Sequence, residues 1–443
     1  MWRWNELPAS AAPTMRPDPA PQGAQSVWPL FDQLEREPFT GALVPRFWRP
    51  PPGVDLDAHL ERLGGEPTIL LMISSYRDFQ CAETVSDAYL KAMHPERVSV
   101  AVVQQTSVAD SSCDSPTLSC AAAPEQPLCA HASRVRIFTL DAKNATGPIY
   151  ARHVGSRMYR GEAFVMQVDA HNLFVRNWDT DVLTQWHATR NEYAVLSTYL
   201  TDLQGSLDAR GTSLRATRPI MCNSDFKEGG STVAYMRHGS QPEEVPALRE
   251  QPMLQPFWGA GFHFSRGHWV VRVPYDCCLP MVFMGEEISM GVRSWSHGYD
   301  VYAPTRSVLF HEYAAFSHRR RAVTLFWEND GRQNKGRYEE SIRRLTALVE
   351  LDPSVDPSSF SRQGEAMYGL GHARPASLFY RLFLIDVHGR STKPICSWVR
   401  DGTMHKDFTR HLRADGKGID YARLADYNTS AHVRLACTDR IWC

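Results

Sequence analysis

The feature that most constrains the fold is an apolar run at 164–168 that stops on Asp169, Ala170 and His171. Such a run predicts a buried strand. Side chains at positions i and i+2 of an extended segment point to the same side, so Asp169 and His171 are expected to lie together. A carboxylate beside an imidazole can bind a divalent cation. The alternative is a turn, since Asp ends many strands by making local hydrogen bonds.

Segments with strand and helix character alternate on both sides of this run. Strands are expected at 68–73, 98–103, 134–141, 193–200 and 307–313, helices at 79–93 and 147–162, and β character at 257–276. This order predicts an α/β fold with a mostly parallel central sheet and helices on both faces. In open sheets of this kind ligands bind beyond the carboxyl ends of the strands, which is where Asp169 lies. A nucleotide-handling enzyme is therefore favoured.

Three parts of the chain differ in their sequence pattern. Residues 1–66 are Pro-rich and are expected to be partly disordered. Residues 67–320 carry the alternating pattern and are expected to form the nucleotide-binding domain. Residues 321–443 read as an appended, helix-rich region.

The overall composition argues against two classes of partner. The chain has 48 basic and 49 acidic residues and a formal net charge of −1. This balance argues against bulk electrostatic binding to nucleic acid or to an anionic membrane. No stretch approaches the roughly 18 apolar residues of a membrane span. The N-terminus lacks an apolar core of signal-peptide length, so a cytoplasmic protein is expected.

The ten cysteines show no Cys-x-x-Cys spacing of a zinc or redox site. Three of them, Cys113, Cys120 and Cys129, cluster in a stretch that resembles a flexible insertion. The sequence favours free surface thiols there, with a zinc site as the alternative.

Other candidate site residues follow predicted strands or lie in predicted helices. A base can stack on Tyr76, and Arg77 or Asp78 can reach the uracil or ribose edge, although the segment can also be an ordinary loop. His311 ends an apolar strand and can complete a metal shell, because imidazole is a common ligand of first-row metals. The full set comprises Ser75, Tyr76 and Arg77 after the first strand, Arg152 before the Asp169 strand, Glu286 and Glu287 at a helix start, and His311.

Arg152 and the adjacent acids each have a functional and a plain interpretation. The Arg152 guanidinium can pair with a diphosphate or form a surface salt bridge. Glu286 and Glu287 can orient a hydroxyl or stabilise positive charge at a reacting sugar carbon. Acids at this position also interact favourably with the helix dipole.

The order of these motifs resembles the polypeptide N-acetylglucosaminyltransferases, which include cytosolic enzymes that modify hydroxyproline on the adaptor subunit of SCF ubiquitin ligases. The matching segments are ISSYRD, ARHVGSRMYRGEAFVMQVDAHNLFVRNWD and a stretch from FWGAGFHF to LFHEY. The resemblance covers roughly residues 67–315. It implies a GT-A fold, an Asp-x-His metal motif on Asp169 and His171, and a later metal-binding His at His311. The N-terminal tail and Cys277–Cys278 depart from the pattern.

The resemblance also implies a reaction. N-acetylglucosamine would move from UDP-GlcNAc to a protein hydroxyl on hydroxyproline, Ser or Thr, with retained configuration. One carboxylate with two imidazoles favours Mn²⁺ over Mg²⁺. The expected protein partner is the SCF adaptor. Two alternatives stay open: an inactive sugar-nucleotide-binding relative, and a metal-dependent nucleotidyltransferase, which usually needs a denser cluster of carboxylates.

Overall fold

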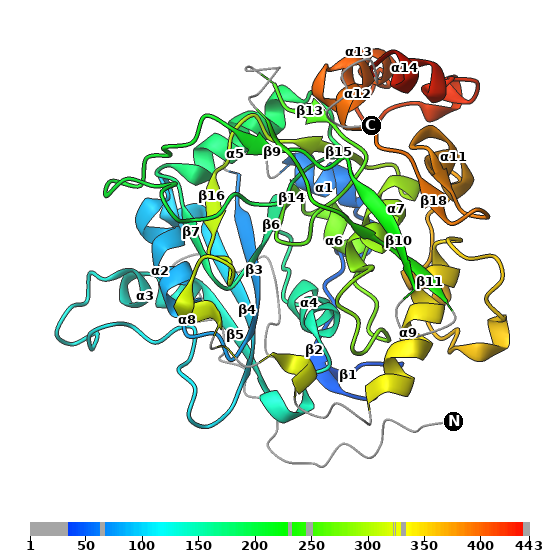
Figure 1. The fold of residues 1–443 in the computed structure, drawn as a ribbon. Helices are drawn as coiled ribbons and strands as arrows, with labels where there is room; N and C mark the ends of the chain where they lie inside the picture. The colour runs from blue at the N-terminus through cyan, green and yellow to red at the C-terminus, as the bar shows by residue number, and fades with distance from the viewer. Residues whose placement is uncertain are drawn as a thin grey trace.

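The computed structural model describes residues 34–62, 67–228, 233–244, 251–321, 323, 325–328 and 334–436. Most of the expected N-terminal segment, residues 1–33 and 63–66, lies outside this range. An eight-stranded sheet forms the centre of the molecule (Figure 1). From edge to edge its strands are β13 (Met253–Leu254), β15 (Asp300–Ala303), β8 (Ala194–Ser197), β14 (Phe262–Arg266), β6 (Phe164–Asp169), β3 (Ile69–Tyr76), β4 (Val98–Thr106) and β5 (Val135–Asp141).

The pairings within this sheet confirm the predicted α/β fold. β3 pairs in parallel with β4 and β6, β4 with β5, and β15 with β8. β14 runs antiparallel between β6 and β8, and β13 is antiparallel to β15. The β character expected at 257–276 extends only through β14, because residues 268–272 form helix α6 (His268–Arg272).

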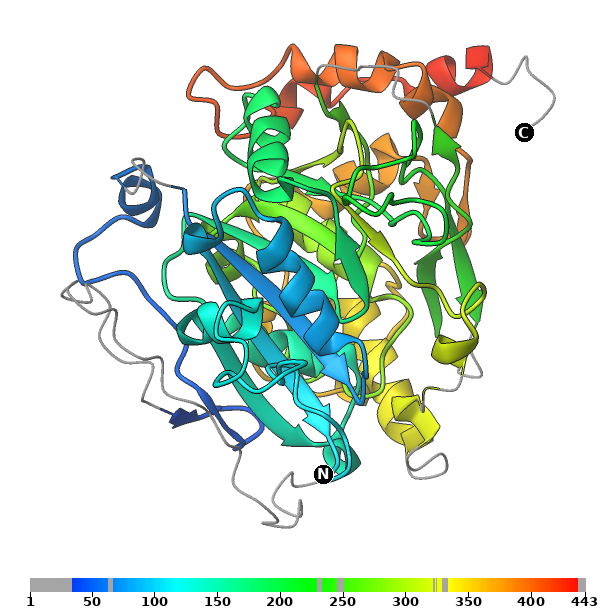
Figure 2. The same cartoon turned by 90° about the vertical axis from the view of Figure 1, so that its left-hand side faces the viewer.

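Successive residues of the central strands enter two different cores, which explains their continuous apolar character. Leu71 and Ile73 pack with α2 (Cys81–Lys91) and α5 (Trp178–Ala188) on one face. Leu70 and Met72 pack with α4 (Pro148–Ser156) and α6 on the other. In Figure 2, α2 lies across the face of the sheet that is turned to the viewer.

Short antiparallel pairs surround the main sheet. They are β1 (Leu34–Arg36) with β2 (Leu43–Pro45), β7 (Asn172–Phe174) with β16 (Leu309–His311), β9 (Arg218–Pro219) with β12 (Glu243–Glu244), β10 (Ser224–Glu228) with β11 (Ala234–His238), and β17 (Ile385–Asp386) with β18 (Ser391–Thr392). The strand expected at 307–313 is therefore β16, outside the main sheet.

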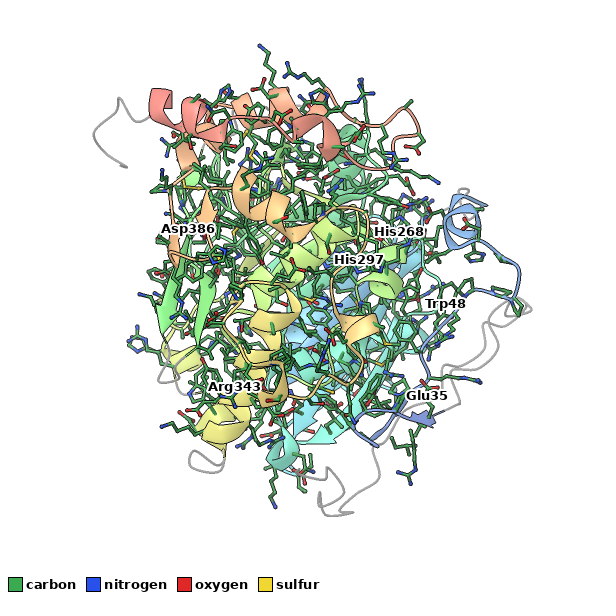
Figure 3. All side chains as sticks on the ribbon, turned by 90° about the vertical axis from the view of Figure 1, so that its right-hand side faces the viewer. Glu35, Trp48, His268, His297, Arg343 and Asp386 are labelled. Carbon is green, nitrogen blue, oxygen red and sulfur yellow. A yellow bond between two sulfur atoms is a disulfide. The ribbon has the colours of Figure 1, made fainter. Side chains whose placement is uncertain are left out.

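The described part of the C-terminal region is rich in helix and packs against the rest of the chain. Its helices are α9 (Asn334–Leu348), α10 (Glu365–Tyr368), α11 (Ala376–Leu382), α12 (Cys396–Arg400), α13 (Thr403–Thr409) and α14 (Thr429–Ala436). The helices of the preceding residues that have not yet been given are α1 (Leu56–Arg62), α3 (Pro127–Ala130), α7 (Glu286–Ser296) and α8 (His318–Arg321). Buried Arg374 donates from Nη1 to Asp300 Oδ1 of β15 at 2.8 Å. In the view of Figure 3, Arg343 of α9 and Asp386 of β17 lie toward the left of the molecule, and Glu35 and Trp48 of the N-terminal segment lie toward the right.

Three disulfides correct the expectation of free thiols. They join Cys81 to Cys113, Cys120 to Cys129, and Cys222 to Cys396. The insertion is therefore closed on itself and tied to the start of α2. Sequence spacing gave no sign of these pairs, because disulfide partners are set by the fold rather than by their separation.

Among the helices that the structure describes, none is long and apolar enough to span a bilayer.

Candidate active site

Three side chains converge at the carboxyl end of β6. Asp169 ends β6, His171 follows it, and His311 ends β16. One ligand atom from each lies within 4.8 Å of those of the other two. His311 Nε2 is 3.4 Å from Asp169 Oδ2, and the two imidazole centroids are 4.4 Å apart. The arrangement joins residues that are more than a hundred positions apart in the chain.

Backbone pairing explains how His311 reaches this place. β16 pairs with β7, and this register sets His311 opposite Asn172 (Figure 1). The amide of Glu312 donates to the carbonyl of His171 at 3.0 Å, and a further bridge joins His311 to Asp202. These three backbone connections therefore fix the backbone of His311 beside the end of β6.

Asp78 orients the imidazole of His171. His171 Nδ1 is 2.8 Å from Asp78 Oδ2, so Nε2 is the ring nitrogen that remains to bind a cation. Burial acts to raise the pKa of the Asp78 carboxyl, but the hydrogen bond with His171 and the charge of Arg320 lower it overall. A carboxylate behind a ligating histidine is a common feature of metal sites, where it fixes the ring. Arg320 of α8 pairs with Asp78 at 2.7 Å, and its Nη2 is 3.4 Å from His171 Nε2.

Arg152 connects Asp169 to Glu286. Its Nη1 donates to both Glu286 oxygens, at 2.6 and 2.7 Å, and its Nη2 donates to Asp169 Oδ1 at 3.1 Å. Burial opposes ionisation of Asp169, yet the hydrogen bond from His311 and the charge of Arg152 hold its pKa below the usual range. The carboxylate therefore stays charged at neutral pH.

The two helix-opening acids sit in different surroundings. Burial raises the pKa of Glu286 to about 7, despite the lowering effect of Arg152. Burial also raises the pKa of Glu287, whose Oε1 accepts from the amide of Ala260 at 2.8 Å and whose Oε2 accepts from the hydroxyl of Tyr199 at 2.6 Å. Glu286 is therefore held from α4, and Glu287 from the loops that follow β8 and precede β14.

The strand expected at 68–73 extends to Tyr76, so Ser75 and Tyr76 end β3 and Arg77 follows it, and the three do not share one arrangement. Ser75 is buried, and its Oγ has no hydrogen-bond partner among the described residues. Tyr76 packs beside the small cluster of Ala145, Met281 and Phe326. Arg77 turns to the positive φ of 48° and pairs with Asp110 at 2.9 Å, so its guanidinium is already engaged.

The donor set fits a first-row divalent cation. One carboxylate and two imidazoles match the mixed oxygen and nitrogen shells of such metals. Burial and nearby His171 lower the pKa of His311, which keeps it neutral and able to ligate. Its Nδ1 is buried and has no partner in the described part of the chain. A Cβ added to Gly261 would lie 3.2 Å from Asp169 Oδ2, so a side chain there would crowd the carboxylate.

Sequence reasoning missed the residues that support the cluster. Asp78 was expected at the edge of a nucleotide, and its place behind His171, 93 residues away in the chain, had no signal in the sequence. Tyr199 and Arg320 gave no signal either, because Tyr199 reads as part of the strand expected at 193–200 and Arg320 as one of three consecutive arginines.

Three comparisons with known proteins bear on this site. The model of the family described as glycosyltransferase (GlcNAc) matches residues 68–128 and 119–388. A search of curated proteins finds no match. Several solved structures share parts of the fold.

These structural likenesses are distant. GalNAc-T7 with UDP, GalNAc and Mn²⁺ has 13% identity and a TM-score of 0.40, covering 69% of this chain and 55% of that chain. S. aureus TarS 1–349 in complex with UDP-GlcNAc has 12% identity and a TM-score of 0.35, covering 67% of this chain and 78% of that chain. The mannosyltransferase PcManGT from Pyrobaculum calidifontis in complex with GDP-Man and Mn²⁺ has 11% identity and a TM-score of 0.37, covering 84% of this chain and 81% of that chain. Likenesses this distant carry no argument about donor, acceptor or metal.

The family match covers most of the chain and includes every residue of the cluster. The α/β sheet agrees with the GT-A fold expected from the motifs, whereas the narrower resemblance to hydroxyproline-modifying enzymes stays a prediction. This protein therefore belongs to the glycosyltransferase (GlcNAc) family.

Proposed function

We propose that the protein transfers N-acetylglucosamine from UDP-GlcNAc to a protein hydroxyl, on hydroxyproline, Ser or Thr, with retained configuration and with a divalent cation. The single observation that carries the proposal is the convergence of Asp169, His171 and His311 at the end of β6. These three residues would hold the cation. Their two imidazole nitrogens are softer ligands than oxygen atoms, which favours Mn²⁺ over Mg²⁺. When bound, such a cation neutralises charge on a leaving diphosphate.

The chain's own residues prepare this site before substrate arrives. Asp78 holds His171 by its Nδ1, and Arg152 holds the Asp169 carboxylate in its charged state. Fixed charges and dipoles of this kind need little rearrangement during the reaction. In this account Arg152 is a positioning residue, because its guanidinium is occupied by Glu286 and Asp169.

Glu286 and Glu287 are assigned to orientation of the sugar or the acceptor. Both carboxylates already accept hydrogen bonds, from Arg152 in one case and from Tyr199 and Ala260 in the other. We therefore prefer attack by the acceptor hydroxyl from the face of the leaving group. In that geometry the diphosphate takes the acceptor proton, and neither glutamate forms a covalent intermediate.

Contacts to the sugar-nucleotide donor are assigned to the last residues of β3, to Arg77 after it, and to the end of β6. The unpartnered Oγ of buried Ser75 and the ring of Tyr76 face the nucleotide in this proposal. Arg77 would contribute only after release from Asp110. Asp169 would contact both the sugar-nucleotide donor and the cation.

The acceptor is assigned to an open hollow of about 350 Å³ beside His311. Glu312, which follows His311, and Asp202, which bridges to it, both line this hollow. Phe316 and Arg319 lie on its wall, and Phe316 is 63% exposed. An apolar ring beside charged side chains suits a peptide segment better than a free sugar.

The compartment bears on the acceptor. A cytoplasmic location stays a prediction, and three disulfides weigh against it, because such bonds persist mainly in oxidising compartments. The same reasoning weighs against the SCF adaptor as the partner, since the enzymes that modify it are cytosolic. We therefore favour a protein acceptor that carries hydroxyproline, Ser or Thr and that lies in an oxidising compartment.

The test measures UDP release by the full-length protein with UDP-GlcNAc, UDP-GalNAc and UDP-glucose, with and without acceptor peptides. The peptides carry hydroxyproline, Ser or Pro at one position. We expect UDP-GlcNAc to be preferred, EDTA to abolish release, and Mn²⁺ to restore it better than Mg²⁺. Full activity in chelator would remove the cation from the proposal, and preference for another sugar would overturn the donor assignment.

A further inference from the structure

Two adjacent cysteines remain outside the three disulfides. Cys277 is buried and Cys278 is half-buried, and both lie in the segment between α6 and α7. All other cysteines of the described residues are paired. Cys437 and Cys443 lie outside the described range.

The two sulfur atoms are unusually close. Cys277 Sγ is 2.6 Å from Cys278 Sγ. This separation exceeds the length of a disulfide bond by only about 0.5 Å. A small displacement of either side chain would bring the two sulfur atoms to bonding distance.

A metal is the competing occupant, because Asp276 and the two thiols also lie within 4.8 Å of one another. Asp276, however, is already engaged: its Oδ2 and Oδ1 accept from Arg344 at 2.7 and 3.1 Å. Metal binding also needs thiolates. Burial, and then the neighbouring sulfur of Cys278, raise the pKa of Cys277, so the neutral form is favoured. A disulfide is neutral and suits this environment better than a metal thiolate.

We propose that Cys277 and Cys278 form a fourth disulfide, between adjacent residues, in the folded protein. The oxidant is a low-molecular-weight disulfide such as oxidised glutathione. The Cys278 thiol loses a proton, attacks one sulfur of the oxidant and displaces one small thiol. The Cys277 thiol then loses its proton, attacks the Cys278 sulfur and displaces the second. Two protein thiols are oxidised by two electrons, and one small disulfide is reduced to two thiols.

The bond would close a ring in a segment that supports the active site. The carbonyl of Tyr275 is 2.8 Å from His153 Nδ1, and the Tyr275 hydroxyl donates to Gln167 Oε1 at 2.7 Å. His153 is adjacent to Arg152 in α4, which holds Asp169. The disulfide thus lies two residues from a contact that anchors α4.

The sequence makes the test direct. Trypsin cuts after Arg272 and Arg293, and the peptide 273–293 holds Cys277 and Cys278 and no other cysteine. The full-length protein is equilibrated with a mixture of reduced and oxidised glutathione that keeps Cys222–Cys396 closed. It is then quenched in acid, and alkylated with iodoacetamide in denaturant with EDTA before digestion and mass spectrometry.

We expect the 273–293 peptide to be unalkylated and lighter than the dithiol by two hydrogens, and to take two carbamidomethyl groups only after reduction. In the Cys278→Ser variant the same peptide should take one carbamidomethyl group without reduction. A doubly alkylated peptide from unreduced wild-type protein would overturn the proposal, and so would a peptide linked to Cys437 or Cys443. A metal bound by the two thiols would also give the doubly alkylated peptide, because EDTA and denaturant would release the metal before alkylation.

Discussion

Residues 67–200 and the chain after residue 200 are held together in different ways. The first part contributes β3, β4, β5 and β6, which are buried along both faces. The second contributes shorter strands, and long-range bonds within it, such as Cys222–Cys396 and Arg374–Asp300, hold its distant segments together. The candidate metal cluster takes Asp169 and His171 from the first part and His311 from the second. Activity therefore depends on correct assembly of both.

The largest expected effect comes from the part that the sequence predicted best. Asp169→Asn keeps the shape of the side chain and removes its charge, while Arg152 keeps its pairing with Glu286. We expect sugar transfer to fall by more than about 100-fold, the upper range for residues that only support metal ligands. Initial rates of UDP release measure this.

A matched substitution supplies the control for that loss. Asp356 caps a turn on the surface of the C-terminal region, and Asp356→Asn makes the same chemical change there. It should leave the rate unchanged. Equal rates in wild type and Asp169→Asn, with unchanged circular dichroism, would remove Asp169 from the site.

The next effect tests whether the first part supports the ligands as well as providing them. Asp78→Asn removes the charge behind His171. We expect the apparent affinity for Mn²⁺ to fall by about 10- to 100-fold, with activity recovering at high Mn²⁺. A Mn²⁺ titration of activity gives this value, and an unchanged midpoint would show that Asp78 does not orient His171.

Disulfide removal compares the two parts in stability. Cys222–Cys396 spans 174 residues and Cys120–Cys129 spans 9. In the chain-entropy account, a longer closed loop restricts the unfolded state more, by about 2–3 kcal/mol for this difference in length. The Cys222→Ser, Cys396→Ser variant should therefore unfold more readily in urea than the Cys120→Ser, Cys129→Ser variant. Equal unfolding midpoints would show that the long-range bond does not hold the second part.

The smallest effect is a pH dependence shared by both parts. Burial lowers the pKa of His153 and His263 to about 3, against about 6.5 in the unfolded chain. Below pH 6.5 the unfolded state binds more protons, so stability falls as the pH is lowered. Each histidine contributes up to about 1.4 kcal/mol per pH unit. Urea unfolding between pH 7 and pH 5 should show a shallower slope for His263→Gln, and an equal slope would contradict the assignment.

The sequence predicted the first part better because its information is local. Strands buried on both faces read as continuous apolar runs, and the Asp169–His171 pair lies within one such segment. The position of His311 depends on the register of β16 against β7, which no local pattern encodes. The partners of Cys81 and Cys222 likewise follow from the fold. Arg320 reaches Asp78 from 242 residues away, so its place at the site was not predictable.

The most direct test of the account is the binding of Mn²⁺ across the two parts of the chain. Electron paramagnetic resonance of free Mn²⁺, titrated with protein, counts bound ions without requiring substrate. We expect one ion per chain in wild type and in the surface control His388→Ala, and loss of that ion in His311→Ala. Wild-type binding by His311→Ala would contradict the claim that the two parts of the molecule together hold a single cation.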